Sequence, residues 1–199
     1  KKMRVVLTGF GKFNGVDENP TEQIIKVLQE KQSDVASEYC TLEVSVDTVN
    51  SFCERFDCND TIFVHLGVHS STECMLLEKC AYNNMTFRCP DENGYNPVGV
   101  CICEDSELDQ SLDTSIPVDS IVSSLQSENY RVNASVDPGR FLCNYIFYQS
   151  LRRMVNNGLS KTAIFIHVPP LKFMPLDQQV NFVERCVQLI SESVASQNV

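Results

Sequence analysis

A cysteine and a histidine occupy positions where α/β proteins expose reactive groups. Cys143 follows the pair Pro138-Gly139 at the predicted start of a helix. His167 ends an apolar run and precedes Val168-Pro169-Pro170, which stops a strand and leads into a loop. A thiolate with an imidazole base can carry out nucleophilic catalysis. The two residues are therefore the first candidates for a nucleophile and its base.

The place of Cys143 in the chain favours a reactive thiol over a packing residue. Unsatisfied backbone N–H groups at a helix start, together with the helix dipole, favour a thiolate over a thiol. Gly139 allows a sharp turn into the helix, whose first turn contains Cys143. The alternative is a buried cysteine that serves only the core.

The base follows by elimination among three histidines. His65 and His69 flank Leu66-Gly67-Val68, which reads as a strand running into a loop. On a strand, residues four apart are roughly 13 Å from each other, too far to share one metal ion. We expect His65 to be a satisfied core or strand-end residue, which leaves His167 as the base.

A Cys/His pair needs a third group that orients the imidazole. Glu78 lies inside the apolar run Met75–Cys80, and a buried acid requires a partner. Its alternative role is an ion pair with Lys79 or an arginine. Arg88, just before Cys89-Pro90-Asp91, is either a loop cation or an oxyanion donor.

Ten cysteines without a secretory signal are better interpreted as reduced thiols than as a disulfide framework. One group of them could hold zinc, but it lacks paired Cys-x-x-Cys spacing, so we predict no metal site. The members of this group are Cys74, Cys80, Cys89, Cys101 and Cys103.

Composition excludes several classes of protein. The 199 residues suffice for one α/β domain, and we predict a single domain over residues 1–199. The net charge of −10 and the lack of a basic block argue against a nucleic-acid or membrane partner. The amino-terminal apolar stretch is too short for a signal peptide, and no run reaches the length of a membrane span. We expect a cytoplasmic protein.

Strands and helices alternate along the chain, which predicts a three-layer α/β/α domain with a mixed, mostly parallel central sheet. Functional groups should gather at strand ends and in the loops beyond them. Residues 74–82 fit a strand or a helix equally well, and residues 84–109 read as loops. Strands are predicted at residues 3–8, 41–46, 61–66, 130–136 and 162–168, and helices from Pro20 and at residues 49–56, 116–128, 142–155 and 176–194.

Five segments, in order, resemble the pyroglutamyl peptidase I family of cysteine peptidases, which remove an amino-terminal pyroglutamate. Each segment alone is weak evidence, but the ordered set is specific and spans most of the chain. The segments are Thr8-Gly9-Phe10-Gly11-x-Phe13-x-Gly15 with Asn19-Pro20-Thr21, Leu77-Glu78-Lys79, Arg88-x-Pro90-Asp91, Gly139-x-Phe141-Leu142-Cys143-Asn144, and Phe165-Ile166-His167-Val168-Pro169.

The resemblance implies a role for each candidate. Cys143 would be the nucleophile, His167 the general base and acid, and Glu78 the orienting carboxylate, while Arg88 and backbone N–H groups would form the oxyanion site. The aromatic positions that enclose the lactam ring in the family match Phe10, Phe13 and Phe141, with Leu142 beside them. The substrates would be peptides with an amino-terminal pyroglutamate, and no cofactor would be needed.

Two other functions and the assembly stay open at this point. The scaffold could bind pyroglutamyl ends without cleaving them, or it could be a thiol redox sensor that uses the cysteine-rich segment. The segment from Cys89 to Cys103 is less like bacterial members of the family than like animal ones. Since this region and its neighbours can form subunit contacts, the sequence does not decide whether the protein is a homo-oligomer.

Overall fold

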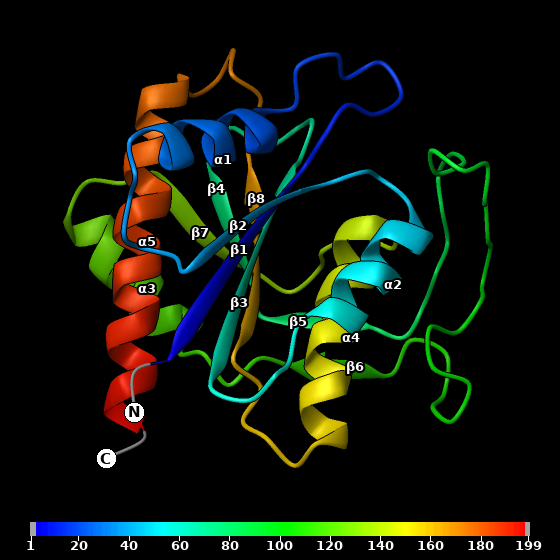
Figure 1. Cartoon of the computed structure of the whole chain (residues 1–199). Coiled ribbons are helices and arrows are strands. Elements are labelled where there is room, and N and C mark those ends of the chain that lie inside the picture. The colour runs from blue at the N-terminus through cyan, green and yellow to red at the C-terminus, as the bar shows by residue number, and fades with distance from the viewer. Residues whose placement is uncertain (1–2, 198–199) are drawn as a thin grey trace.

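A six-stranded sheet with strand order β2-β1-β3-β8-β4-β7 forms the centre of the computed structural model, which describes residues 3–197 (Figure 1). Four neighbouring strand pairs are parallel, and only β4 and β8 are antiparallel. The prediction of a mixed, mostly parallel sheet is confirmed. The strands are β1 (Arg4–Phe10), β2 (Glu38–Leu42), β3 (Thr61–Val68), β4 (Met75–Glu78), β7 (Val132–Ser135) and β8 (Ala163–Val168).

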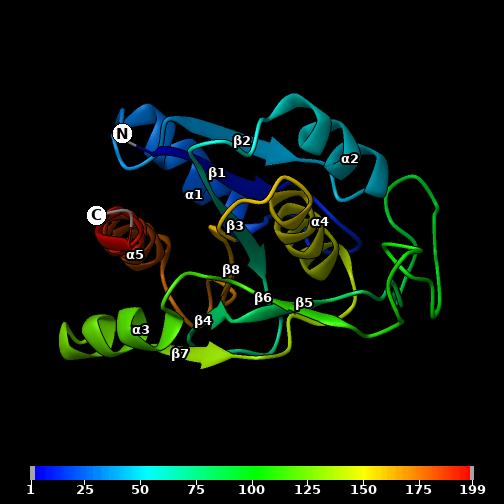
Figure 2. The same ribbon diagram turned by 90° about the horizontal axis from the view of Figure 1, so that it is seen from below.

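Helices cover both faces of the sheet, as the three-layer prediction requires (Figure 2). On one face lie α1 (Pro20–Glu30), α3 (Val118–Ser127) and α5 (Leu176–Gln197). On the other face lie α2 (Val46–Arg55) and α4 (Leu142–Asn156). No helix in residues 3–197 is long and apolar enough to cross a membrane.

Strand alternation assigns residues to the two faces. In β8, Ile164 and Ile166 pack into the cluster shared with α1, α3 and α5, whereas Ala163 and Phe165 pack into the cluster shared with α2 and α4. His167 has the parity of the second set, because successive side chains of a strand point to opposite faces. The strand therefore directs His167 to the face that carries α4.

The ambiguous segment 74–82 forms strands, not a helix. After β4 the chain continues into β5 (Cys80–Tyr82), which pairs with β6 (Ser111–Asp113) as a separate antiparallel ribbon. Between these strands the chain is irregular, as predicted for residues 84–109, with one isolated bridge between Met85 and Val100. This loop extends beyond α2 and α4, away from the other helical layer (Figure 1).

The predicted strand over residues 41–46 and helix over residues 49–56 are misplaced along the chain. The strand ends at Leu42 and the helix already begins at Val46. Ser45 caps the helix by accepting a hydrogen bond from Thr48 N at 3.2 Å, and the distant Asp91 accepts one from Val46 N at 2.9 Å. The alternating apolar residues Val44 and Val46 favoured a strand over residues 41–46, although the helix begins there with the polar cap Ser45.

Candidate active site

Cys143 is the second residue of α4, at the helix start that the sequence predicts. Phe141 is the N-cap residue and offers no side-chain cap, and the turn before it contains Gly139 with φ of 76°. The first N–H groups of a helix have no partner within the helix, so the first turn of α4 presents free donors beside the thiol. The same donors and the helix dipole stabilise negative charge there.

His167 and Glu78 meet across the antiparallel contact between β8 and β4. His167 Nδ1 lies 2.7 Å from Glu78 Oε1, with 4% and 0% of the two side chains exposed. Burial lowers the pKa of His167, but negative charge on Cys143, a hydrogen bond with Cys143 and the contact with Glu78 together raise the pKa to about 9. Because Nδ1 is held by the carboxylate, Nε2 is the ring nitrogen left for the thiol.

Gly67 creates the space in which the thiol approaches the sheet. It lies in β3 opposite His167 of β8. A Cβ atom at this position would lie 2.8 Å from Cys143 Sγ and 2.6 Å from Phe165 Cζ. Such distances are shorter than real Cβ contacts, so the Cys143 thiol has this position only because residue 67 has no side chain.

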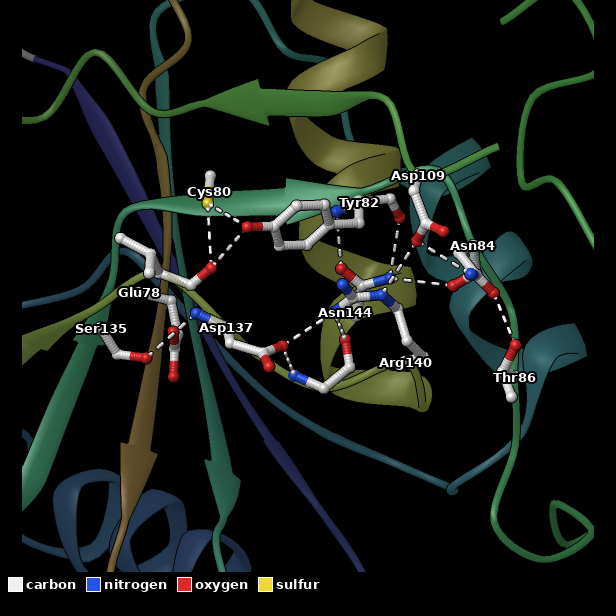
Figure 3. Close-up of polar contacts among 12 residues, drawn as sticks. Glu78, Cys80, Tyr82, Asn84, Thr86, Asp109, Ser135, Asp137, Arg140 and Asn144 are labelled. Carbon is white, nitrogen blue, oxygen red and sulfur yellow. Dashed lines mark hydrogen bonds and ion pairs between the residues drawn. The ribbon is translucent and has the colours of Figure 1, made fainter. Parts of the chain in front are cut away.

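Arg140, in the segment before Cys143, contacts β5 and the loop between β5 and β6 (Figure 3). Arg140 Nη1 donates to Asp137 Oδ1 at 2.8 Å, and its guanidinium lies 4.0 Å from the ring centre of Tyr82. Arg140 also pairs with Asp109 at 3.4 Å. These contacts hold the turn that leads into α4.

One cavity of about 270 Å³ lies against the thiol, and we call it the aromatic cavity. Phe13 and Phe141 pack there with ring centres 5.0 Å apart and ring planes tilted by 41°, and Phe87 meets Phe141 edge-on at 4.7 Å. The structure thus brings together the four predicted binding residues and the nucleophile. The lining includes Phe10, Phe13, Phe141, Leu142, Cys143, Gly67, Val44 and Leu171.

The end of β1 with Phe10, and the loop after it that carries Phe13, are held by the start of α1. Asn19 caps this helix through Thr21 N at 3.0 Å and donates to Gly11 O at 3.0 Å. Thr21 Oγ1 accepts from Phe10 N at 2.9 Å. The Asn19-Pro20-Thr21 segment therefore positions Phe10 and the turn that follows it, and Asn19 and Pro20 themselves line the cavity.

A second cavity of about 180 Å³, which we call the polar cavity, shares Cys143, Arg88 and Phe141 with the first. Its own lining includes His69, Thr86, Arg140 and His167. The exposed Arg88 has its guanidinium carbon 5.8 Å from the Phe141 ring centre, where the two cavities join. No distance fixes Arg88 on the thiol, so its role as an oxyanion donor stays a prediction.

Other predicted residues have structural roles, as expected. His65 is fully buried between Thr8 Oγ1 at 2.8 Å and Ser150 Oγ at 2.9 Å, and burial lowers its pKa to about 3. Lys79 pairs with Asp119 at 2.7 Å and not with Glu78. The ion-pair alternative for Glu78 with Lys79 is thereby removed.

His69 and Gly67 are site residues that the sequence reasoning missed. His69 follows the carboxyl end of β3, and its ring centre lies 5.3 Å from that of His167. The general expectation that sites gather beyond parallel strand ends could have found it. Within residues 3–197, no group of three or more His, Cys, Asp or Glu side chains is placed to hold a metal ion, and all ten cysteines are unpaired.

Comparison with known proteins gives a consistent result. The family described as pyroglutamyl peptidase matches residues 3–195. A pyrrolidone-carboxylate peptidase of Thermococcus litoralis is 34% identical over 89% of this chain and 80% of that protein. The solved structure of a pyrrolidone carboxyl peptidase from the same organism superposes with a TM-score of 0.86 at 28% identity, covering 98% and 96% of the chains. The enzyme from Fervidobacterium islandicum gives 0.84 at 26% identity, covering 98% and 99%.

Proposed function

The chain belongs to the pyroglutamyl peptidase family, and we propose that Cys143, His167 and Glu78 carry out its reaction. The protein is a cysteine-type omega peptidase that removes an amino-terminal pyroglutamyl residue from peptides. The observation that supports these roles best is the sequence of contacts from Glu78 through the buried His167 to Cys143 at the start of α4.

Acylation begins from a thiolate and an imidazolium. The Cys143 sulfur attacks the pyroglutamyl carbonyl carbon, and the carbonyl oxygen becomes an oxyanion. Backbone N–H groups of the first turn of α4 and the guanidinium of Arg88 are the donors that stabilise it. His167 then gives its Nε2 proton to the leaving amine, the C–N bond breaks and a thioester remains.

Deacylation uses the same groups in reverse. A water molecule attacks the thioester carbonyl while the now neutral His167 takes its proton. The C–S bond breaks, pyroglutamate leaves, and the thiolate and imidazolium are restored. Glu78 stays at Nδ1 throughout, which keeps Nε2 aimed at the reacting atoms and stabilises the imidazolium.

The aromatic cavity explains why the substrate is a lactam. Pyroglutamate presents a small, flat, uncharged ring that Phe10, Phe13 and Phe141 can cover. An amino-terminal glutamate or glutamine carries an ammonium group, which would lose its hydration among these rings without a compensating charge. Selectivity therefore comes from rejecting the open-chain residues.

We also propose that the enzyme acts in the cytoplasm. We propose no nucleic-acid partner, because the net charge of −10 would be repelled by a nucleic-acid backbone. The matches name peptidases and so favour neither a binding protein without catalysis nor a redox sensor.

The central experiment is turnover of pyroglutamyl-7-amido-4-methylcoumarin by the wild type, Cys143→Ala and Cys143→Ser. We expect both variants to lose all measurable turnover and to keep their circular dichroism spectrum, because residue 143 is half-exposed at a helix start. A Cys143→Ala protein that kept a tenth of wild-type kcat would overturn the nucleophile assignment.

A further inference from the structure

We propose that the polar cavity binds the residue that follows pyroglutamate and favours a residue that bears a carboxylate, on its side chain or at a free carboxyl terminus. This inference rests on the proposed function, because it divides the substrate at the bond that Cys143 cleaves. Neither the family match nor the relatives say anything of this preference.

The geometry assigns the two cavities to the two sides of the scissile bond. His167 must give its proton to the leaving amine, so the leaving residue has to lie where His167 is accessible. His167 lines the polar cavity, whereas the lining of the aromatic cavity does not include it. The lactam therefore occupies the aromatic cavity and the next residue occupies the polar one.

The charge of the polar cavity selects the ligand. Its lining contains two arginines and two histidines, and no aspartate or glutamate of residues 3–197 belongs to it, although the chain carries a net charge of −10. Arg140 is paired with Asp137 and Asp109. Arg88 has no ion pair with any described residue, and its guanidinium carbon lies 5.8 Å from the ring centre of Phe141. A guanidinium carries five N–H donors, so Arg88 can bind a substrate carboxylate in addition to the oxyanion of the proposed mechanism.

His69 provides a second donor. Its Nδ1 accepts from the backbone N–H of Ser71 at 3.4 Å, which places the proton of the neutral ring on Nε2. Burial and the neighbouring His167 and Arg88 lower the pKa of His69, against the opposing effect of Glu78, so the ring is a neutral donor at pH 7. A neutral donor beside Arg88 binds a carboxylate without adding a positive charge next to His167.

The test compares isosteric substrates that differ only in charge. We would measure kcat/KM for pyroglutamyl-glutamate amide against pyroglutamyl-glutamine amide, and for pyroglutamyl-alanine as the free acid against its amide. The first pair reports a side-chain carboxylate and the second a terminal one. We expect a preference of about threefold to fivefold for the carboxylate in at least one pair, as for a partly exposed ion pair.

Variants at His69 assign the preference to this cavity. His69→Ala should at least halve the ratio, and His69→Glu should reverse it, because it places a carboxylate in the cavity. Ser124→Glu, which adds the same charge on the exposed face of α3, should leave the ratio unchanged.

If the coumarin substrate is cleaved but the wild-type ratio is near one in both pairs, the proposed carboxylate preference is wrong. A ratio that His69→Glu leaves unchanged would also contradict it. Failure to cleave the coumarin substrate would instead overturn the proposed function.

Independently, the geometry points to Asn144 as a positioning residue for the nucleophile (Figure 3). Its side chain is fully buried next to Cys143 in the chain. Oδ1 accepts from Tyr82 N at 2.8 Å, while Nδ2 donates to Tyr82 O at 2.8 Å and to Asn84 O at 3.1 Å. Both amide protons and one oxygen lone pair are used by the backbone of one short segment.

The segment that Asn144 holds also carries the orienting acid. Glu78 ends β4, and β5 begins two residues later and ends at Tyr82. Asn144 thus ties the helix start with Cys143 to the same piece of chain that places Glu78 on His167. The distance from thiol to imidazole is then set by two anchors on one continuous segment, in which β4 is followed directly by β5.

The test separates positioning from stability. We expect Asn144→Asp, which keeps Oδ1 but loses both donors, to lower kcat on the order of 100-fold at nearly unchanged KM, because small displacements of a nucleophile have such effects. The pH profile of Cys143 alkylation by iodoacetamide should shift as well. Asn144→Ala should show the same kcat loss.

Ser150→Ala is the matched control, since it removes another buried hydrogen bond of α4, the one to His65 at 2.9 Å. It should lower the urea midpoint and keep both kcat and the alkylation profile. If Asn144→Asp lost stability like Ser150→Ala but kept kcat and the profile, Asn144 would have a structural role only. An Asn144→Ala protein that fails to fold leaves the decision to Asn144→Asp.

Discussion

Gly67→Ala should damage catalysis more than any other single methyl group added to a glycine of this chain. The new Cβ would lie 2.8 Å from Cys143 Sγ and 2.6 Å from Phe165 Cζ, whereas ordinary contacts begin at 3.4 Å. The sulfur must therefore move by about 0.6 Å, and Phe165 by about 0.8 Å, or the strand must shift. Phe165 has no free space, because it is fully buried in the core shared with α4, whereas the Cys143 sulfur borders both cavities and is the group that would be displaced.

This displacement gives a magnitude for both rate and stability. Misplacing a reacting atom by about 1 Å costs roughly 100-fold in rate, so we expect kcat to fall between about tenfold and a hundredfold. Overpacking of a buried site should lower the free energy of unfolding by about 1 to 3 kcal/mol. The assays are coumarin-amide turnover, urea unfolding and iodoacetamide alkylation of Cys143.

Two other glycines serve as controls. At Gly11 the nearest atom to a new Cβ is Leu42 O at 3.7 Å, so Gly11→Ala should behave like the wild type. At Gly9 the Cβ would lie 2.7 Å from the backbone oxygen of Thr21, so Gly9→Ala should lose stability while Cys143 alkylation is spared. Gly67→Ala with more than half of wild-type kcat would refute the reasoning, because the thiol would then tolerate the displacement.

Three further predictions concern the residues of the reaction itself. Glu78→Gln should keep part of the activity and Glu78→Ala less, because an amide oxygen can still accept from His167 Nδ1 at the present 2.7 Å; wild-type kcat/KM in both would make Glu78 a packing residue. Phe141→Ala should cost about 1 to 3 kcal/mol of transition-state binding, roughly tenfold to a hundredfold in kcat/KM. Iodoacetamide should still alkylate Cys143 in this variant, but a pyroglutamyl inhibitor should no longer protect the thiol. Full protection would show that the lactam binds elsewhere. Since the pKa of His167 is raised to about 9, the imidazolium that protonates the leaving amine is present below that pH and is lost above it. We therefore expect kcat/KM to decline near pH 9. A decline already near pH 7 would show that Cys143 and Glu78 do not hold the proton on the ring.

The sequence by itself determined the layered fold and pointed to the residues that we propose for the reaction. Alternating apolar strands and amphipathic helices are local patterns, and so are the Gly139 turn before Cys143 and the proline stop after His167. Glu78 was already a candidate as an acid inside an apolar run, and the ordered motifs added its expected orienting role and the aromatic positions. These local features can be predicted from the sequence because each depends on residues close together in the chain.

Only the tertiary structure decided how these residues meet. The antiparallel placement of β4 beside β8 brings Glu78 to His167, and nothing in either segment specifies that pairing. The closeness of Gly67 to the thiol, the inclusion of His69 in the polar cavity and the anchoring of Asn144 on Tyr82 are contacts between segments far apart in sequence. Likewise, α2 starts at Val46 partly because Asp91 accepts a hydrogen bond from Val46 N, and a local pattern cannot contain a partner 45 residues away.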